Sequence, residues 1–300
     1  MLRWLGLPLL ALLLLTQVAA GPTAQTGAPS RLFSNEEQDS LRVRLHAAGL
    51  DEAWLAGLRL DTLRCYPGRL RLNLSYPSGR TSYAHYLQAE TVDQLKAFLR
   101  REAPLLAAAE TRHGVPAEVI AAILMVETRL GEQTGPFRAP DLFLTLLLHE
   151  AATSPAALDT AEARERRFGG TRGRAELEGI IRGRAVERAR WAQKEFRTLA
   201  RLVPTEHWNT LPCSYAGAIG LPQFMPTSLG AYGDDGDGNG VVELGNLPDA
   251  VFSIGRYLKE NGWRGRMTEA RRSRAVHHYN HSDAYVRTVL KLARAVGMRG

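Results

Sequence analysis

Hydrophobic residues recur at helical spacing through most of the chain, and convincing strand alternation is absent. Leu41, Leu45 and Leu50, for example, share one face of a helix that begins near Asn35 and that Gly49 can end. We therefore expect a mainly α protein in which residues 31–300 pack as a single domain. The same pattern predicts further helices over residues 55–60, 91–113, 116–131, 141–152, 175–202, 248–261 and 283–296.

The helix predicted over residues 116–131 carries the first candidate for chemistry. Thr91 is expected to cap the preceding helix and Gly114 to end it, and Pro116 suits the first turn of the next helix. Glu127 then follows a run of apolar residues. Burial disfavours the charged form of a carboxyl group and raises its pKa, as a general acid at neutral pH requires. Taken alone, a glutamate near a helix end is more often a surface residue, and it is the neighbouring apolar residues that favour burial here.

Residues 214–226 offer groups that could bind a hydroxyl-rich ligand. Their small residues let the backbone approach a ligand closely, Gln223 offers an amide, and Tyr215 and Phe224 offer aromatic faces. A tight turn between packed helices is the alternative interpretation of this segment.

A second polar and aromatic cluster precedes the last helix. Tyr279, Asn280 and Tyr285 lie close together in the sequence there, and neighbouring tyrosine and asparagine side chains suit hydroxyl-rich ligands. A helix cap at Ser282 or Asp283 explains the same residues without a ligand.

An acidic loop over residues 234–249 contains five acids and no base. From Asp235 its sequence matches the opening of an EF-hand calcium loop, with glycine at the sixth position. The twelfth position lacks the bidentate glutamate, so a calcium ion here would be bound weakly and have a structural role. An Asx-rich turn without an ion is the alternative. The predicted ligands are Asp235, Asp237, Asn239, Val241 and Asn246.

The first 20 residues have the pattern of a secretory signal peptide, with one positive charge, a short apolar core and small residues before a cleavage point after Ala20. Residues 21–30 are rich in Gly, Pro, Thr and Ala and predict a flexible mature N-terminus. We expect a soluble exported protein without a stable membrane anchor; a retained N-terminal anchor is the alternative. Export would make Cys65 and Cys213 candidates for a disulfide, but their spacing does not decide whether they pair.

Charge narrows the class of partner. The formal charge is +7, and the excess lies in residues 164–201 and 256–300, on either side of the acidic loop. An acidic partner is indicated. A nucleic-acid binder conflicts with the predicted leader and lacks a recognition motif.

Four blocks follow one another at compatible spacing: residues 113–116 leading into 126–131, residues 214–226, residues 257–263 and residues 279–285. In these blocks the sequence resembles the family B lytic murein transglycosylases, exported bacterial enzymes with a lysozyme-like α-rich fold. Weaker agreement, including residues 73–75 and 83–87, extends the resemblance over most of residues 31–296.

The resemblance implies cleavage of the β-1,4 bond between N-acetylmuramic acid and N-acetylglucosamine in peptidoglycan glycan strands, without water, to leave 1,6-anhydromuramoyl ends. Glu127 would be the single acid and base, so no catalytic cofactor is implied. The expected location is the bacterial periplasm. The residues expected to bind the sugars or line the cleft are Ser214, Gln223, Tyr257, Tyr279, Asn280 and Tyr285.

The sequence departs from the family pattern at three places that bear on substrate reach. Leu130 stands where an aromatic residue is common, and Gly245 replaces a usual tryptophan. Only 15 residues separate Trp263 from Tyr279, where better-known relatives insert a small subdomain. Two other functions stay open: a hydrolytic muramidase on the same scaffold, or a non-catalytic peptidoglycan-binding protein, against which an intact Glu127 argues.

Overall fold

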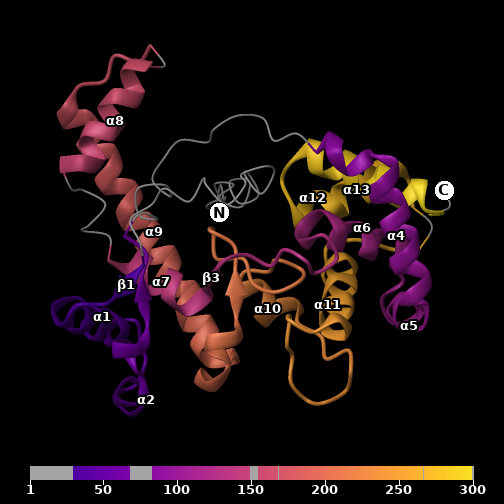
Figure 1. Cartoon of the computed structure of the whole chain (residues 1–300), viewed down its shortest axis with the longest axis horizontal. Coiled ribbons are helices and arrows are strands. Elements are labelled where there is room, and N and C mark those ends of the chain that lie inside the picture. The colour runs from indigo at the N-terminus through magenta and orange to yellow at the C-terminus, as the bar shows by residue number, and fades with distance from the viewer. Residues whose placement is uncertain (1–29, 68–82, 149–154, 168, 266, 299–300) are drawn as a thin grey trace, which may run out of the picture.

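The fold is mainly α-helical, as the sequence predicts (Figure 1). It is described from a computed structural model over residues 30–67, 83–148, 155–167, 169–265 and 267–298. The α-helices are α1 Asn35–Ala47, α2 Glu52–Gly57, α4 Ala89–Arg101, α5 Ala103–His113, α6 Ala117–Thr128, α7 Ala139–Leu147, α8 Pro155–Arg167, α9 Arg174–Leu202, α10 Pro226–Tyr232, α11 Leu247–Glu260, α12 Glu269–Tyr279 and α13 Asp283–Ala295. Short 3-10 helices are η2 Leu60–Thr62, η3 Ala84–Leu87 and η5 Thr205–Thr210.

Strand structure is confined, in the described part of the chain, to two antiparallel pairs of two-residue strands and two isolated bridges. β1 Arg31–Leu32 pairs with β2 Arg64–Cys65, and β3 Phe137–Arg138 pairs with β4 Pro212–Cys213. Each cysteine therefore belongs to a different sheet. Both thiols are buried and unpaired, which answers the question that their spacing left open.

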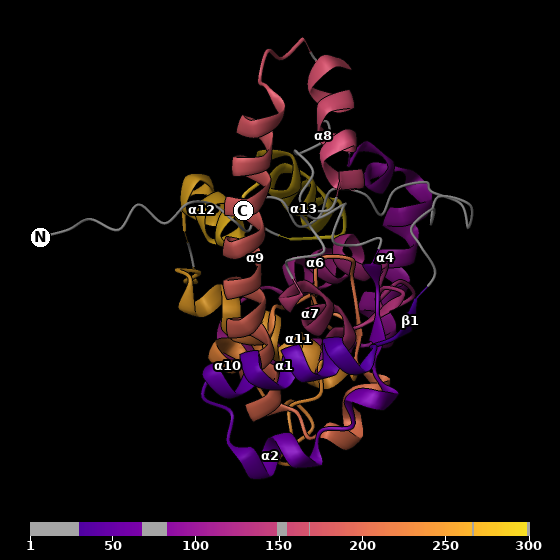
Figure 2. The same ribbon diagram turned by 90° about the vertical axis from the view of Figure 1, so that its left-hand side faces the viewer.

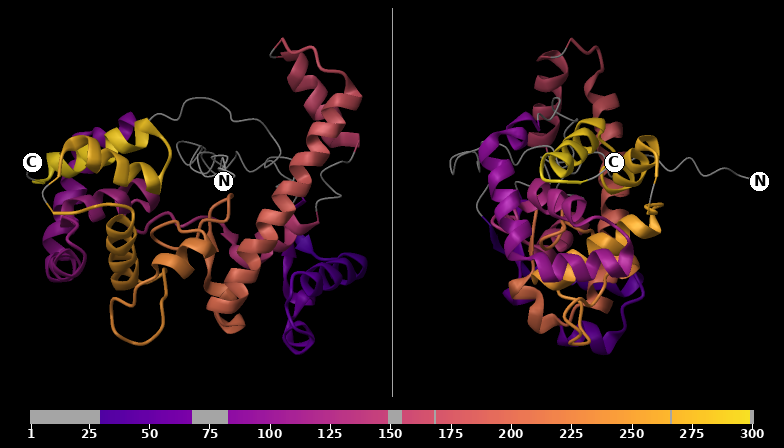
Figure 3. Two further views of the ribbon diagram at one scale, coloured as in Figure 1. Left: turned by 180° about the vertical axis from the view of Figure 1, so that it is seen from behind. Right: turned by 90° about the vertical axis from the view of Figure 1, so that its right-hand side faces the viewer.

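One group of helices is built around α6. This helix is apolar on all sides, so it is stable only when fully enclosed, and its residues from Val119 to Thr128 are all buried. α13, α4, α5 and α11 pack against it (Figures 1 and 3). The candidate glutamate is therefore carried on the most enclosed helix of this group.

A second group is organised by α9. Its C-terminal half packs on α7 and α10. Its N-terminal half pairs with α8, and the two form a hairpin that projects from the body of the molecule (Figures 1 and 2). Leu158, Leu177 and Ile181 are buried in this hairpin. Many of its arginines are paired with acids, as in the 2.8 Å contact between Arg174 and Asp159.

Several helix boundaries differ from the sequence-based expectation. The helix predicted over residues 91–113 is two helices, because the chain leaves helical geometry at Glu102 and Pro104 lies at the start of α5. Thr91 is a buried residue inside α4 and not its cap, which is Gln88. Helices α8, α10 and α12 were not predicted, because they are short or carry many charges.

The predicted signal peptide, residues 1–20, and residues 21–29 of the predicted flexible N-terminus lie outside the described residues. The family-like residues 73–75 also lie outside them. In the part of the chain that the structure describes, no helix is both long and apolar enough to cross a membrane.

Candidate active site

Backbone geometry fixes the end of α6. Gly114 ends α5 in the left-handed conformation, with φ of 69°, as the sequence predicts. Directly after α6, Arg129, Leu130 and Gly131 have φ angles of 50°, 59° and 104°. Left-handed backbone is costly for residues other than glycine, and such strain is concentrated at functional sites. The chain therefore leaves helical geometry directly after Thr128, and α6 ends sharply one residue beyond Glu127.

Glu127 lies in the last turn of α6 and is only 4% exposed. Tyr285 Oη donates a hydrogen bond to Glu127 Oε1 over 2.6 Å. Glu127 Oε2 is buried and has no hydrogen-bond partner among the described residues. Burial raises the pKa of the carboxyl group to about 8, although the Tyr285 hydrogen bond acts to lower it. The group is therefore mostly protonated at neutral pH and has one oxygen uncommitted.

Four tyrosines surround this carboxyl group. The Tyr279 and Tyr285 rings are stacked with centroids 6.4 Å apart, and Tyr83 meets Tyr285 edge-on at 5.9 Å. Tyr86 Oη donates to the backbone carbonyl of Val126 over 3.1 Å and so binds η3 to α6. The rings exclude water from the carboxyl group, which is the physical source of its raised pKa.

The loop over residues 214–226 is joined to α6 by the hydroxyl of Thr128, which donates to the carbonyl oxygen of Leu221 over 3.0 Å. Ser214 Oγ accepts hydrogen bonds from the backbone N–H groups of Ala216 and Ala218, so the serine shapes the turn from within. Its own hydroxyl hydrogen has no acceptor among the bonds of the described residues. The loop is therefore held against the end of the Glu127 helix.

Gln223 lies at the tight end of the same loop, with a positive φ of 52°. Its Nε2 donates to the carbonyl oxygen of Gly220 over 2.9 Å and to that of Thr134 over 3.3 Å. The amide donors are thus used within the protein, and the side-chain oxygen is the group left for a ligand. Gly135 approaches the loop so closely that an added Cβ atom would lie 2.2 Å from the Cys213 carbonyl oxygen.

A second aromatic group lies next to the tyrosines around Glu127. Phe224, Tyr257 and Tyr279 pack on one another with centroid distances of 4.8–5.8 Å. Tyr257 Oη donates to the carbonyl oxygen of His278, and Tyr279 Oη donates to that of Pro222. Phe224 is only 3% exposed and supports the two tyrosines from below the surface.

A cationic aromatic contact lies on α9. The guanidinium of Arg188 lies over the Trp191 ring, 4.1 Å from its centroid. Burial lowers the Arg188 pKa to about 10, and the nearby Tyr215 hydroxyl acts against this shift. The partly buried Tyr215 is thus near a buried positive charge. Sequence reasoning did not single out Arg188, because it is one of many arginines in this segment.

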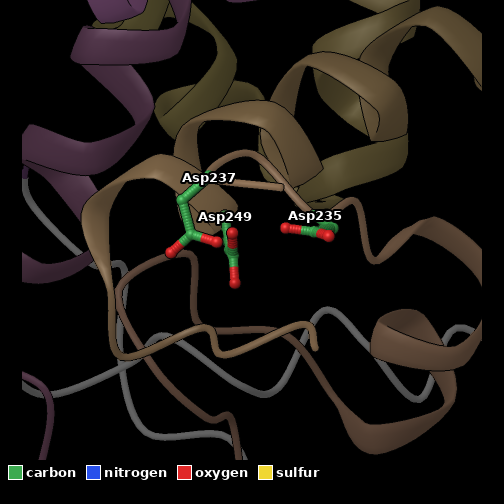
Figure 4. Close-up of side chains that lie close together, drawn as sticks. All are labelled: Asp235, Asp237 and Asp249. Atoms are coloured by element: carbon green, nitrogen blue, oxygen red, sulfur yellow. The ribbon is translucent and has the colours of Figure 1, made fainter. Parts of the chain in front are cut away.

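The acidic loop gathers three carboxylates, as Figure 4 shows. One oxygen from each of Asp235, Asp237 and Asp249 lies within 4.8 Å of the others. Backbone N–H groups, first that of Gly240, donate to Asp235 and lower its pKa. Carboxylate oxygens are the ligands that calcium and magnesium prefer.

This arrangement adds Asp249, which the sequence did not suggest, to the predicted Asp235 and Asp237. Asn246 caps α11 by accepting from the Asp249 N–H, and its amide donates to Asp237 and Asp249. Asn239 Oδ1 accepts from the N–H of Val241, whose side chain is exposed. The third carboxylate comes from Asp249 in the first turn of α11, three residues beyond the twelfth position of the EF-hand pattern.

The model of the family described as the transglycosylase SLT domain matches residues 34–273. The chain belongs to this family. A curated relative is the membrane-bound lytic murein transglycosylase B of Escherichia coli, 30% identical over 153 residues. The match covers 50% of this chain and 33% of the relative, so it spans about a third of that protein. The family resemblance seen in the sequence is confirmed.

Two solved structures share the fold of this SLT-domain chain. SltB3 from Pseudomonas aeruginosa, in complex with NAG-anhNAM-pentapeptide, is 20% identical with a TM-score of 0.64, and the match covers 87% of this chain and 78% of that one. Escherichia coli lytic transglycosylase Slt35, in complex with calcium, is 21% identical with a TM-score of 0.63, over 87% and 92% of the two chains. They confirm the mainly α, lysozyme-like fold.

Within this transglycosylase domain, most of the predicted site residues lie in two adjoining groups. Tyr279 and Tyr285 lie beside Glu127, and Asn280 is buried at the end of α12. Tyr257 adjoins them through Tyr279. The Ser214–Gln223 loop adjoins α6, whereas the acidic loop follows α10. The sequence did not single out Arg188 or Asp249, and it marked Tyr83 and Tyr86 only as part of the weakly family-like residues 83–87.

Proposed function

We propose that the protein is a peptidoglycan lytic transglycosylase that uses Glu127 as its single acid and base. One observation carries the proposal: a buried carboxyl group with a pKa raised to about 8, held through one oxygen by Tyr285 and uncommitted at the other. The family of the domain and the curated relative support the substrate class.

The proposed reaction begins with proton transfer from Glu127 to the oxygen that links the two sugars. The bond from that oxygen to C1 of the N-acetylmuramoyl unit breaks, and positive charge develops at C1. The Glu127 carboxylate then takes the proton of the C6 hydroxyl, whose oxygen bonds to C1. A 1,6-anhydro ring forms, Glu127 is protonated again, and no water is consumed. A raised pKa suits both steps, because the group must give and regain a proton near neutral pH.

Tyr285 positions the acid in this proposal. Its hydroxyl fixes Oε1, which leaves Oε2 as the oxygen that carries the transferable proton. The rings of Tyr83 and Tyr279 flank that of Tyr285 and keep the carboxyl group in an apolar setting. Water exclusion favours ring closure over hydrolysis, because the C6 hydroxyl is then the nucleophile at hand.

We assign sugar binding to the loop over residues 214–226 and to the aromatic groups beside it. Among the hydrogen bonds of the described residues, the Ser214 hydroxyl hydrogen and the Gln223 side-chain oxygen are not used within the loop. Tyr257 packs on Tyr279, and Asn280 directly follows Tyr279 at the end of α12, so both residues adjoin the same aromatic group. Arg188 beside Tyr215 adds a positive charge suited to a carboxylate of the substrate. SltB3, which has the same fold, is known in complex with a pentapeptide-bearing fragment.

The acidic loop is proposed to bind a structural calcium ion. Asp235, Asp237 and Asp249 would supply carboxylate oxygens, and an ion would relieve the repulsion among them. The Slt35 structure in complex with calcium supports this assignment. The ion would steady the connection between α10 and α11 and takes no part in the proton transfers.

We propose that the enzyme is located in the periplasm, where it acts after residues 1–20 have been removed. Its substrate there would be the glycan strands of the cell wall, which are anionic as a whole. The positive charge of residues 164–201 and 256–300 fits attraction to such a polymer.

Mass spectrometry of digested peptidoglycan sacculi tests the proposed function. The lyase gives muropeptides with 1,6-anhydro ends, each lighter by one water than the product of a muramidase. Reducing ends in place of anhydro ends would assign hydrolysis. Binding without release of muropeptides would assign a non-catalytic role.

A further inference from the structure

A pocket of about 270 Å³ lies where α11 passes into α12, outside the groups of residues assigned to catalysis, sugar binding and calcium. α12 packs on both α11 and α13 in this part of the molecule (Figures 1 and 3). The lining of the pocket includes three arginines and three other residues: Arg264, Arg271, Arg274, Asn261, Gly262 and Met267. Nothing proposed above gives this pocket a role.

The protein does not neutralise the three arginines. Among the residues that the structure describes, no carboxylate lies within ion-pair distance of Arg264, Arg271 or Arg274. Glu269, the acid in the first turn of α12, is instead paired with Arg294 on α13. Three like charges around one pocket repel one another, and an anion between them would remove that repulsion.

The arginines are placed to present donors to one ligand. Arg271 and Arg274 are three residues apart and both line the pocket, so they come from one face of α12. Arg264 reaches the pocket from the connection between the two helices. Its Nη1 donates to the carbonyl oxygens of Lys259 and Trp263, which holds the side chain and leaves its other guanidinium nitrogens without a partner among the described residues.

Three guanidinium groups suit a phosphate better than a carboxylate. A guanidinium group binds either anion through two parallel hydrogen bonds. A carboxylate has a single charge and two oxygens to share among the three arginines. A phosphate monoester carries a charge of about −1.5 to −2 and has three strong acceptor oxygens. The set of donors therefore matches the charge and the acceptors of a phosphate monoester.

The size and the remaining lining favour a phosphate bonded to a small alcohol. The pocket has the volume of about nine water molecules at about 30 Å³ each, which is more than a bare phosphate ion fills. Asn261 Nδ2 donates to the carbonyl oxygen of Tyr257 over 2.9 Å, and Oδ1 accepts no hydrogen bond from the described residues. This oxygen can accept from a hydroxyl group of the ligand. The space beside Gly262 is open, with nothing within 4 Å of an added Cβ atom.

We propose that this pocket binds the phosphate monoester of a small polyol, with the phosphate between Arg264, Arg271 and Arg274. The site goes beyond the proposed function and does not depend on Glu127. Glycerol phosphate has this chemistry in two sources, free in solution as sn-glycerol 3-phosphate and in a membrane as the headgroup of phosphatidic acid. Arg271 and Arg274 are exposed, so the phosphate of either source can reach them.

Calorimetric titration with sn-glycerol 3-phosphate, at about 0.15 M salt to screen weak surface charge effects, tests the proposal. Arg271→Ala/Arg274→Ala should weaken binding about tenfold or more. Arg271→Lys/Arg274→Lys keeps the charge but loses the paired donors, so its affinity should lie between those of the wild type and the alanine variant. Arg100→Ala/Arg201→Ala is the control and should bind as the wild type does, since it removes the same charge from exposed arginines elsewhere.

Two comparison ligands test the chemistry of the pocket. Inorganic phosphate should bind the wild type more weakly than the ester, because it leaves part of the pocket unfilled, and acetate should bind more weakly still. No saturable binding of the ester, acetate binding as tight as that of the ester, full affinity in the lysine variant or the same loss in the control would overturn the proposal.

Cosedimentation with vesicles identifies the source of the phosphate. Phosphatidylcholine vesicles are compared with and without phosphatidic acid, for the wild type and Arg271→Ala/Arg274→Ala. Binding that needs both phosphatidic acid and the two arginines identifies a membrane headgroup as the ligand, and binding of the soluble ester alone identifies a solute. Both kinds of measurement need no turnover, so their outcome is independent of whether the protein cleaves sacculi.

Discussion

Tyr285 and Glu127 are 158 residues apart in the chain, and a hydrogen bond of 2.6 Å joins their side chains. The bond comes from the packing of α13 on α6, the contact on which the group of helices around α6 is centred. It acts against burial: the apolar surroundings raise the Glu127 pKa and the phenol donor lowers it. The balance of the two places the carboxyl group close to the pH at which it must exchange protons.

Tyr285→Phe should move the alkaline limb of activity to higher pH. Without the donor the carboxylate is less stable, so the Glu127 pKa rises above its present value of about 8. The limb of kcat/KM that reports loss of the acidic proton follows it, and the rate falls about tenfold because the carboxyl group is less well oriented. Tyr86→Phe is the matched control, since that hydroxyl bonds to a backbone carbonyl. A limb that stays in place or moves to lower pH in Tyr285→Phe contradicts this role.

Glu127→Gln should have a higher free energy of unfolding than the wild type, by an amount that grows as the pH rises. In the folded wild type the pKa is about 8, whereas an unfolded glutamate has a pKa of about 4.3. The folded state therefore binds the proton more tightly, and the free energy of unfolding declines between these two values. Glutamine does not titrate, so the variant avoids this loss, which amounts to a few kcal/mol. Urea unfolding at pH 5 and at pH 9 measures it; an advantage independent of pH would mean that the carboxyl group is not buried as described.

The fold was largely predictable because its strongest signals are local. The apolar run of α6, the glycine after α5 and the apolar face of α13 all act through neighbouring residues. The break between α4 and α5 was missed, although Pro104 was a visible signal for it. The hairpin of α8 and α9 was not foreseen as a unit, because its arginines and acids look like solvated charge until their ion pairs are seen.

The residues of the candidate site were predictable only where a family motif or a short local pattern marks them in the sequence. Glu127 was marked by the apolar run before it, and Tyr279, Asn280 and Tyr285 by their closeness in the sequence. Tyr83 lies in the weakly family-like residues 83–87, but its contact with Tyr285 arises from tertiary packing that the sequence does not show. Asp249 was missed for another reason: the EF-hand spacing ends at Asn246, and the third carboxylate is brought in by the first turn of α11.

Gly135→Ala should destabilise the protein more than Gly49→Ala does. Both glycines have positive φ angles, 105° and 81°, so both substitutions strain the backbone by about 1–2 kcal/mol. At Gly135 the new Cβ atom also meets the Cys213 carbonyl oxygen at 2.2 Å, whereas nothing lies within 4 Å at Gly49. We expect a total loss of about 2–4 kcal/mol at Gly135 in urea unfolding. Equal losses at the two positions would show that the close approach of Gly135 to Cys213 is relaxed without cost.

Calcium should raise the unfolding temperature through the acidic loop. Binding to the folded state alone stabilises it according to the ratio of free calcium to Kd, with about 2.7 kcal/mol at a hundredfold excess over Kd. Asp237→Asn should abolish most of the shift, because it removes one of the three gathered carboxylates. Asp39→Asn, at an exposed position in α1, is the control and should retain the full shift. A calcium-induced shift of the same size in both variants would place the ion elsewhere.

The measurement that bears most directly on the central claim is product analysis in water labelled with heavy oxygen. Wild-type enzyme should release muropeptides with 1,6-anhydro ends that contain no label, because the C6 hydroxyl supplies the attacking oxygen. Glu127→Gln should release none while still binding sacculi. Label incorporated at C1 by the wild type, or muropeptide release by Glu127→Gln, would contradict the assignment of Glu127 as the single acid and base of a lytic transglycosylase.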